Sequence, residues 1–308
     1  MLRRRLLPTV LAMLTAATLA SPALAGKPTG GPRDVGGGPP DDEPWIPPTA
    51  EQQASLDLRL GQADELNVAA RTSSNSLAID SGFCPTISRS TGIDAATSTT
   101  CATPSYTLAT YARRQVKDYY CGPATAQVII NRSRGVYSSN IDGQSTTTNY
   151  KTQTYIATKL TWTNPANGRV EDTDDIGQTN AYMLANGLNV LAKLPSGFAY
   201  AVVATGTGSQ WHSKVITDTQ QWHMAFATAI KMTSSSQRLS SWDPIPAGVT
   251  VRHWIPIRGY RGLWDGSNTP RVYYNDSSDR QGGGTGSYSD SSVLVYNLNQ
   301  WHTARVVW

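Results

Sequence analysis

The stretch RRQVKDYYCGPATAQVII, residues 113–130, places one cysteine, Cys121, at the beginning of a predicted helix. Pro123 suits the first turn of a helix, an apolar run follows it, and Gly135 supplies a stop, so we predict a helix over residues 122–133. The positive end of a helix dipole favours the thiolate, which is the nucleophilic form of cysteine. Cys121 is therefore a candidate nucleophile, although its position alone also fits a structural role.

Two segments farther along the chain supply the groups that a cysteine nucleophile needs, namely a base and an acceptor that orients the base. His253 lies in a predicted strand over residues 249–260, and Asp276 ends a predicted strand over residues 270–276. A turn joins the two strands, so they can pair antiparallel and bring His253 near Asp276. Asn275 is an alternative orienter, but neighbouring side chains of a strand point to opposite faces, so only one of the two can serve. Structural roles, as a half-buried strand histidine and a turn aspartate, stay open for His253 and Asp276.

Gln115 lies six residues before Cys121. The tetrahedral intermediate of acyl transfer carries negative charge on the former carbonyl oxygen. A side-chain amide, together with the backbone N–H of the nucleophile, can stabilise that charge. We predict this role for Gln115, with a solvated loop glutamine as the alternative.

Taken together, these segments resemble a known family. Gln115 and Cys121 with the helix entry YYCGPATAQ, then His253 in RHWIPIRGY, then Asp276 in VYYND resemble a papain-like cysteine peptidase of the double-glycine-leader (bacteriocin-processing) type in a stand-alone secreted form. The similarity covers about residues 113–276. It implies an α+β, papain-like fold in which an N-terminal helical part carries the cysteine and a C-terminal antiparallel sheet carries the histidine and the aspartate. It also implies catalytic roles for the four residues and a peptide or protein substrate.

The chain also departs from that family. About 130 residues separate Cys121 from His253, and the Ser/Thr-rich stretches between them look like elaborated loops. Loops of this kind commonly determine substrate choice, so specificity does not follow from the resemblance. The chain has no GxxxxGK[ST] nucleotide-binding motif and no later apolar segment long enough to cross a bilayer. These features argue against the transporter-coupled form of the family.

The order of the predicted elements separately favours an α+β fold. Besides the helix at 122–133, we predict a helix from the acidic segment at 171–175 to just before Gly187, and another over residues 222–230, where apolar residues recur at helical spacing. Segments rich in β-branched and aromatic residues predict strands over residues 198–205, 249–260, 270–276, 292–298 and 303–308. Helices followed by strands are typical of a largely antiparallel sheet packed beside helices.

Three sections are predicted along the chain. Residues 1–25 have the basic start, apolar stretch and small-x-small cleavage site of a secretory signal peptide. Residues 26–82 combine a Gly/Pro-rich linker with a helix-like segment, which is either a pro-segment or an N-terminal brace. Residues 83–308 are long enough for one sizeable core and form the predicted peptidase domain.

Cysteine content and charge narrow the function classes. Three cysteines in an exported protein leave one unpaired, and we predict a disulfide between Cys84 and Cys101, which leaves Cys121 free. Removing the three arginines of the signal peptide lowers the formal net charge from +4 to +1, which argues against a nucleic-acid partner. The four histidines are scattered and show no metal-binding spacing, so we expect no metal and no cofactor.

The sequence therefore predicts a secreted, extracellular cysteine peptidase that hydrolyses peptide bonds with a Cys-His-Asp triad and an oxyanion glutamine. A cell-wall amidase and a transglutaminase-like acyl transferase are alternatives that use the same triad. A non-catalytic secreted binding module is the alternative from another class. The cleavage specificity, the removal of residues 26–82 and the oligomeric state stay open.

Overall fold

The computed structural model describes part of the chain. The described residues are 34–35, 38, 40, 43–73, 86–88, 97–99, 105–136, 151–234, 236–264, 267–278 and 285–308. All of them belong to one compact unit, Pro32–Trp308. The predicted signal peptide and both cysteines of the predicted disulfide lie outside the described residues.

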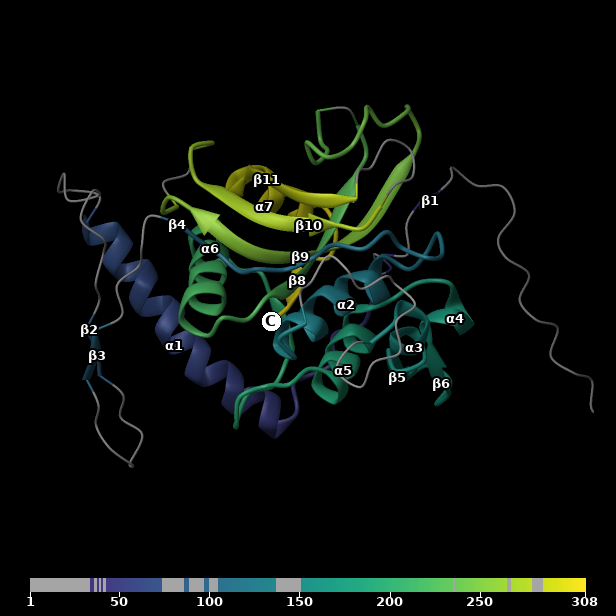
Figure 1. The fold of residues 1–308 in the computed structure, drawn as a ribbon, viewed down its shortest axis with the longest axis horizontal. Helices are drawn as coiled ribbons and strands as arrows, with labels where there is room; N and C mark the ends of the chain where they lie inside the picture. The colour runs from purple at the N-terminus through teal and green to yellow at the C-terminus, as the bar shows by residue number, and fades with distance from the viewer. Residues whose placement is uncertain are drawn as a thin grey trace, which may run out of the picture. The chain divides into compact units, whose positions relative to one another are not determined.

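The centre of the unit is a β-sheet whose strands differ in length, and β9 is its central strand (Figure 1). Its six main strands follow the order β11, β10, β9, β8, β12, β7, and each pairs antiparallel with its neighbour. Their bounds are Gly286–Ser291, Arg271–Asp276, Thr250–Arg261, Phe226–Met232, Arg305–Val307 and Val202–Ala204, in that order. Two short strands also pair with β9: β4 (Ser105–Thr107) antiparallel and β1 (Asp34–Val35) parallel.

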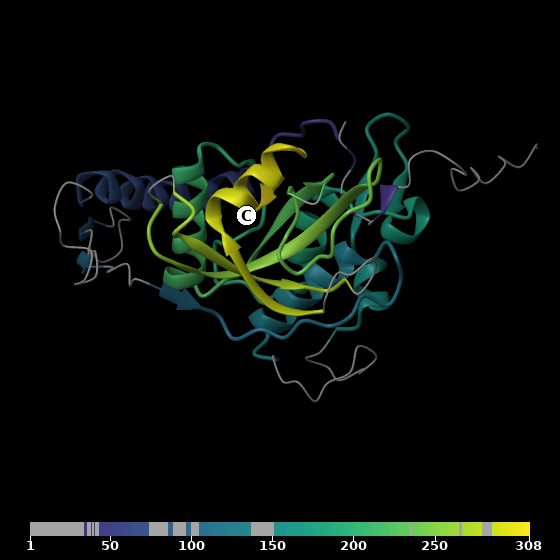
Figure 2. The same cartoon turned by 90° about the horizontal axis from the view of Figure 1, so that it is seen from above.

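Helices cover both faces of this sheet. Figure 2 shows the sheet between α2 (Cys121–Ser133) on one side and α7 (Ser292–Gln300) on the other. The remaining helices and the π-helical turn η2 surround these layers: α1 (Ala50–Ser73), α3 (Gln153–Ala157), α4 (Thr173–Ile176), α5 (Ala181–Leu191), α6 (Gly208–Ile216) and η2 (Thr217–Gln221). Two separate hairpins complete the described structure: β2 (Thr86–Ser88) with β3 (Thr97–Thr99), and β5 (Thr161–Thr163) with β6 (Val170–Asp172).

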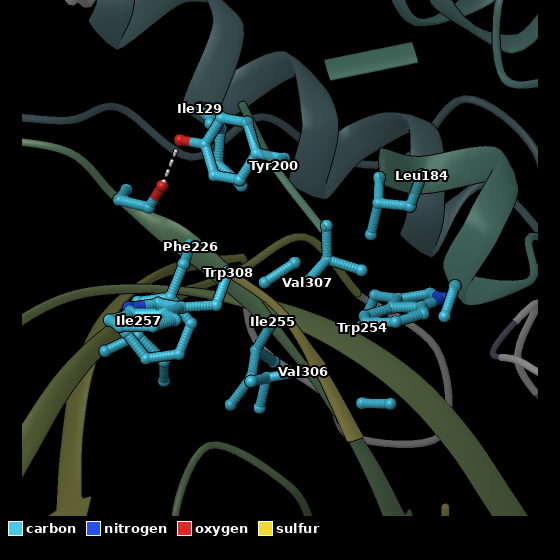
Figure 3. Close-up of a cluster of buried hydrophobic side chains, with 14 of the residues drawn as sticks. Ile129, Leu184, Tyr200, Phe226, Trp254, Ile255, Ile257, Val306, Val307 and Trp308 are labelled. Atoms are coloured by element: carbon cyan, nitrogen blue, oxygen red, sulfur yellow. Dashed lines mark hydrogen bonds between the residues drawn. The ribbon is translucent and has the colours of Figure 1, made fainter. Parts of the chain in front are cut away.

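The main hydrophobic core lies between the sheet and the helices α2 and α5 (Figure 3). Ile129 of α2 and Leu184 of α5 point toward aromatic and branched side chains of β8, β9 and the C-terminal strand. Tyr200 fits into this apolar layer because its hydroxyl donates to the Ala225 carbonyl at 2.6 Å. The helix α2 is buried over most of its length, from Cys121 to Asn131, so it runs through the unit as a central helix. The predicted helix at 122–133 is confirmed.

The predicted helix at 222–230 is wrong, because this segment contains the strand β8. Every residue of β8 except Lys231 is buried, since α2 packs on one face of the sheet and α7 on the other. A strand that is buried on both faces shows no apolar-polar alternation, and its continuous apolar run also satisfies helical spacing. The periodicity therefore could not separate the two structures.

The predicted strand at 292–298 is also wrong, because these residues form α7. Its valines and tyrosine favour strands by propensity, but tertiary packing overrides such preferences. In α7, Val295 and Leu298 lie one turn apart and are both fully buried against the sheet. The single helix predicted to start at the acidic segment is two helices, α4 and α5, separated at Gly177, which has a φ of 66°.

The strand predictions at 249–260 and 270–276 are confirmed by β9 and β10. Those at 198–205 and 303–308 hold in part, because β7 and β12 are shorter than the predicted segments. The chain is therefore a mixed helical and antiparallel-sheet protein, as the α+β prediction states. The order of elements is less simple than predicted, since α7 lies between the last two strands of the chain.

The helix α1 packs into the unit over residues 55–63. Leu56 and Ala63 are buried, and Ser55 exchanges two hydrogen bonds with the backbone of Ala199. Arg59 is fully buried and pairs with Asp218 of η2 at 3.2 Å. These contacts make α1 an internal part of Pro32–Trp308, although they leave its processing in the cell as an open prediction.

Candidate active site

Cys121 is the first residue of α2 and is fully buried. The start of α2 lies against Thr179, and this close approach is possible because Gly122 has no side chain. A Cβ added at Gly122 would lie 2.2 Å from the Thr179 hydroxyl oxygen. The carbonyl of Thr179 in turn accepts a hydrogen bond from the Trp254 indole at 2.8 Å. This contact chain holds the N-terminus of α2 beside β9, the strand that carries His253.

His253 and Asp276 form a buried pair between adjacent strands. The distance from His253 Nε2 to Asp276 Oδ1 is 3.0 Å, and the two side chains are 1% and 0% exposed. Pairing between β10 and β9 ends at Tyr274 opposite Ile257, so Asp276 reaches His253 diagonally beyond the last ladder pair. The antiparallel pairing that the sequence predicted is what brings the two side chains together.

The proton affinity of His253 follows from its neighbours. Burial by itself lowers the pKa of the imidazole, but the charge and hydrogen bond of Asp276, together with a hydrogen bond to Cys121, raise the pKa to about 10. Because Nε2 faces Asp276, Nδ1 is the ring nitrogen available to Cys121. The site therefore favours an imidazolium at neutral pH, which is the partner that a thiolate requires.

Asp276 has three more hydrogen-bond donors, none of which the sequence predicted. Oδ2 accepts from the Ser241 hydroxyl at 2.9 Å and from the Trp242 indole at 2.8 Å, and Oδ1 accepts from the Ser278 N–H at 2.9 Å. The Trp242 ring also meets the His253 ring edge to face, with centroids 5.5 Å apart. Ser241 and Trp242 come from a connecting segment with no sequence motif, so only the tertiary structure identifies them.

Asn275 points away from the pair. Its Oδ1 accepts from the Thr110 hydroxyl at 2.6 Å, and its Nδ2 donates to the Ser287 hydroxyl at 2.8 Å. The alternation of a strand thus separates Asn275 and Asp276 onto opposite faces. Of the two candidate orienters, Asp276 is the one beside His253.

Gln115 lies in the loop that leads to Cys121 and is 8% exposed. Its Nε2 donates to the carbonyls of Lys117 and Asp118, at 3.2 and 2.8 Å, and its backbone N–H donates to Ser277 at 2.9 Å. The side-chain amide therefore braces its own loop in this state. An oxyanion role requires the amide to turn from these carbonyls toward Cys121, and it stays a prediction.

Asp174 anchors the second half of the same loop. Its carboxylate accepts hydrogen bonds from Lys117 at 2.8 Å, from Tyr119 at 3.0 Å and from Tyr120 at 2.8 and 2.9 Å. Burial alone would raise the pKa of Asp174, but these donors lower it below its ordinary value. The acidic segment was predicted only as a helix start. It does contain the N-cap of α4, Asp172, but its contact with the loop before Cys121 is visible only in the fold.

Over the described residues, no group of three or more His, Cys, Asp or Glu side chains is placed to hold a metal ion. Within the same part of the chain, no helix is both long and apolar enough to cross a membrane.

Comparison with protein-family models and with curated proteins finds no match for this chain. The geometry around Cys121, His253 and Asp276 is therefore the basis on which a function can be proposed.

Proposed function

We propose that the protein is a secreted cysteine peptidase with a papain-like arrangement of catalytic groups. The observation that carries the proposal is the buried His253–Asp276 pair beside Cys121 at the start of a central helix. A nucleophile, a base and an orienting acid in contact are the combination that activated cysteine chemistry needs. The order of the three residues along the chain also agrees with the family resemblance.

In the proposed reaction, the Cys121 thiolate attacks the carbonyl carbon of a peptide bond and forms a C–S bond. The negative charge moves to the carbonyl oxygen, where the Cys121 N–H can donate, because the first N–H groups of a helix have no acceptor within the helix. As the C–N bond breaks, the His253 imidazolium gives its proton to the leaving amine. Asp276 keeps the ring oriented throughout.

The second half of the reaction releases the acyl group. Neutral His253 takes a proton from water, the resulting hydroxide attacks the thioester carbonyl, and the C–S bond breaks to return the thiolate. The products are a carboxylic acid and an amine. If an amine replaces water in this step, the same groups perform the acyl transfer considered as an alternative.

A substrate panel with active-site variants tests the proposal. The full secreted chain is incubated with a mixed peptide library, with amine acceptors and with muropeptides, and the products are identified by mass spectrometry. We expect peptide cleavage that Cys121→Ala abolishes and Cys121→Ser reduces strongly, with the thermal unfolding midpoint unchanged within a few degrees. Undiminished cleavage by Cys121→Ala would exclude the proposed nucleophile. Products from amines or muropeptides alone would favour the acyl transferase or the amidase.

The burial of Cys121 and His253 favours one other candidate function, a secreted binding module in which these two residues have only a structural role. The two functions differ in thiol reactivity. A peptidase must expose Cys121 to a substrate carbonyl, so iodoacetamide should label Cys121 in the folded protein at pH 6, where an ordinary thiol with a pKa of about 8.5 is almost wholly protonated. A binding module should show labelling only after unfolding.

A further inference from the structure

A buried glutamine, Gln153, lies beside the loop that carries Gln115. It is the first residue of the short helix α3, and none of its surface is exposed. A buried amide must find hydrogen-bond partners, because an unpaired polar group in the interior destabilises the fold. The partners of Gln153 therefore show what this side chain does.

The amide of Gln153 contacts the backbone on both sides of Gln115. Its Oε1 accepts from the Val116 N–H at 2.9 Å, and its Nε2 donates to the Arg114 carbonyl at 3.0 Å. A neighbouring β-strand would pair with residues 114 and 116 in the same way. The side chain thus takes the place of a strand and fixes the backbone conformation at Gln115.

The other edge of this loop is hydrogen-bonded to the end of β10, next to the pair formed by His253 and Asp276. The Gln115 N–H donates to the carbonyl of Ser277, the residue directly after Asp276, at 2.9 Å. The loop is consequently held between Gln153 on one side and the end of β10 on the other. A shift of Gln153 would change the position of Gln115 relative to Asp276.

Gln153 also connects this loop to the helix of the nucleophile. Its Nε2 donates to Gln127 Oε1 at 3.1 Å, and Gln127 lies on α2, six residues after Cys121. The Nε2 of Gln127 in turn donates a hydrogen bond to the Lys151 carbonyl at 2.9 Å. The amide pair between Gln127 and Gln153 therefore couples α2 to the loop through groups that are themselves buried.

We propose that Gln153 is a positioning residue of the candidate active site, which sets the loop at Gln115 against the helix of Cys121. This inference rests on the proposed peptidase function. It assigns to Gln153 no contact with the substrate. Its effect on the reaction comes from alignment, where a displacement of about 1 Å can lower a rate by about a hundredfold.

The variant Gln153→Met tests the inference, because methionine nearly keeps the volume and removes all three hydrogen bonds. The matched control is Asn189→Leu. Asn189 makes the same kind of amide clamp on another backbone segment, donating to the Tyr200 carbonyl at 2.8 Å and accepting from its N–H at 2.6 Å. Both variants remove a two-sided amide contact, but Asn189 clamps Tyr200 instead of the loop before Cys121.

With a peptide that the wild-type chain cleaves, we expect Gln153→Met to lower kcat by about 10- to 100-fold with KM changed by less than about threefold. Asn189→Leu should stay within about threefold of wild type in both constants. Thermal unfolding should show losses of stability of the same order for both variants. Equal kcat values in wild type and Gln153→Met, or equal losses of kcat in the two variants, would overturn the inference.

A second measurement needs no peptidase substrate and separates the two proposals. The rate of iodoacetamide labelling at Cys121 is followed by mass spectrometry at pH 7 in the folded proteins. We expect the labelling rate to change by at least about fivefold in Gln153→Met and in Gln153→Glu. The second variant is more conservative, because glutamate keeps the oxygen that accepts from the Val116 N–H. The labelling rate of Asn189→Leu should equal that of wild type. If wild type cleaves no peptide and the labelling still changes in this pattern, the peptidase proposal fails while the positioning role holds. Unchanged labelling in both Gln153 variants counts against the positioning role.

Discussion

At the scale of single residues, the candidate site depends on the hydrogen bonds that the Asp276 carboxylate accepts. A buried carboxylate is strongly disfavoured unless hydrogen bonds compensate for its lost hydration. Here both oxygens have two donors each: His253 and the Ser278 N–H at Oδ1, and Ser241 and Trp242 at Oδ2. These four donors leave the carboxylate little freedom to rotate, and this in turn fixes the ring of His253.

Trp242→Phe tests this arrangement, because it removes the indole N–H and keeps most of the aromatic contact. A hydrogen bond to a charged group contributes about 1.5–3 kcal/mol, so we expect a loss of stability in that range together with a fall in kcat/KM. Chemical denaturation and peptide kinetics measure the two effects.

The matched control for Trp242 is Trp222→Phe. The Trp222 indole donates to Gln62 of α1 at 2.8 Å, on an element that carries none of the candidate catalytic residues. This variant should lose stability but keep kcat/KM within about twofold. A similar fall in kcat/KM in both variants would show that Trp242 acts through general stability.

The proton affinity of His253 gives a second prediction at this scale. Because its pKa in the folded chain, about 10, lies above the ordinary value of 6.5, His253 contributes stability that is fully present below pH 6.5 and is lost as the pH rises toward 10. NMR titration of the ring nitrogens should show an imidazolium through pH 8.

The same titration in Cys121→Ala separates the causes of this shift. Cys121 is one of the groups that raise the pKa of His253, so its removal should lower the midpoint, while Asp276 keeps it above 6.5. A wild-type His253 that loses its proton near pH 6.5 would contradict the proposed ion pair.

At the scale of elements, α1 is joined to the unit by a buried charge pair. The carboxylate of Asp218 lies 3.2 Å from Arg59, and neither side chain is exposed. Burial raises the pKa of Asp218 to about 6, even though Arg59 opposes that shift. Arg59 also donates to the Ala199 carbonyl at 2.9 Å and lies over the ring of Trp308, 4.5 Å from its centroid.

Arg59→Met should therefore destabilise the chain by about 3–5 kcal/mol, because it leaves Asp218 buried without its cation. The double variant Arg59→Met/Asp218→Leu should recover part of that loss, since the uncompensated charge is gone. Urea unfolding measures both, with exposed Arg169→Met as the control that changes stability by less than about 0.5 kcal/mol. A loss below 1 kcal/mol for Arg59→Met would contradict the structural role of this pair.

The segment just before α1 contains a buried acid with an altered proton affinity. Burial raises the pKa of Glu43 to about 7, although the Ala181 N–H, which donates to it at 2.7 Å, acts in the opposite direction. The ionised form is thus disfavoured in the folded chain. Stability should fall as the pH rises from about 4.5 to 7, by at most about 3 kcal/mol.

Glu43→Gln keeps an oxygen for the Ala181 N–H and removes the titration. We expect this variant to be more stable than wild type at pH 8 and to lose the part of the pH dependence that lies between pH 4.5 and 7. Urea unfolding at several pH values tests this. Equal pH dependence in the two proteins would exclude Glu43 as its source.

At the scale of the whole molecule, segments far apart in the chain complete one unit. The strand β12, near the C-terminal residue, lies between β8 and β7, and Trp308 exchanges two backbone hydrogen bonds with Ala201. Arg59 of α1 packs against the ring of that same tryptophan. We therefore expect the unit to need both α1 and β12 in order to fold.

A truncation series tests this dependence. A chain that begins at Gly26 should fold, whereas a chain that begins at residue 83, the predicted start of the peptidase domain, lacks α1 and should be insoluble or unfolded. Circular dichroism and gel filtration distinguish the two results. A folded, cooperative unit from residue 83 would show that α1 is dispensable and would support its role as a removable pro-segment.

Much of the fold was predictable where local rules agree with burial. The helix at Cys121 and the strands β9 and β10 were identified because turn residues, propensity and apolar content agree there. The predictions for the segments that form β8 and α7 are wrong. The strand β8 is buried because helices cover both faces of the sheet, and α7 is a helix that packs on one of those faces. The supports of the site, Trp242, Asp174 and Gln153, carry no local signal because each acts on residues far away in the sequence.

The sequence by itself determined which residue types are available for chemistry and in what order: an amide, a thiol at a helix start, and an imidazole and a carboxylate on strands that can pair. Only the tertiary structure decided that Asp276 and not Asn275 meets His253, that Gln115 braces its own loop, and that α1 is packed into the unit. The physical reason is that motif and periodicity are local, whereas hydrogen-bond partners and burial depend on which distant segments share one core.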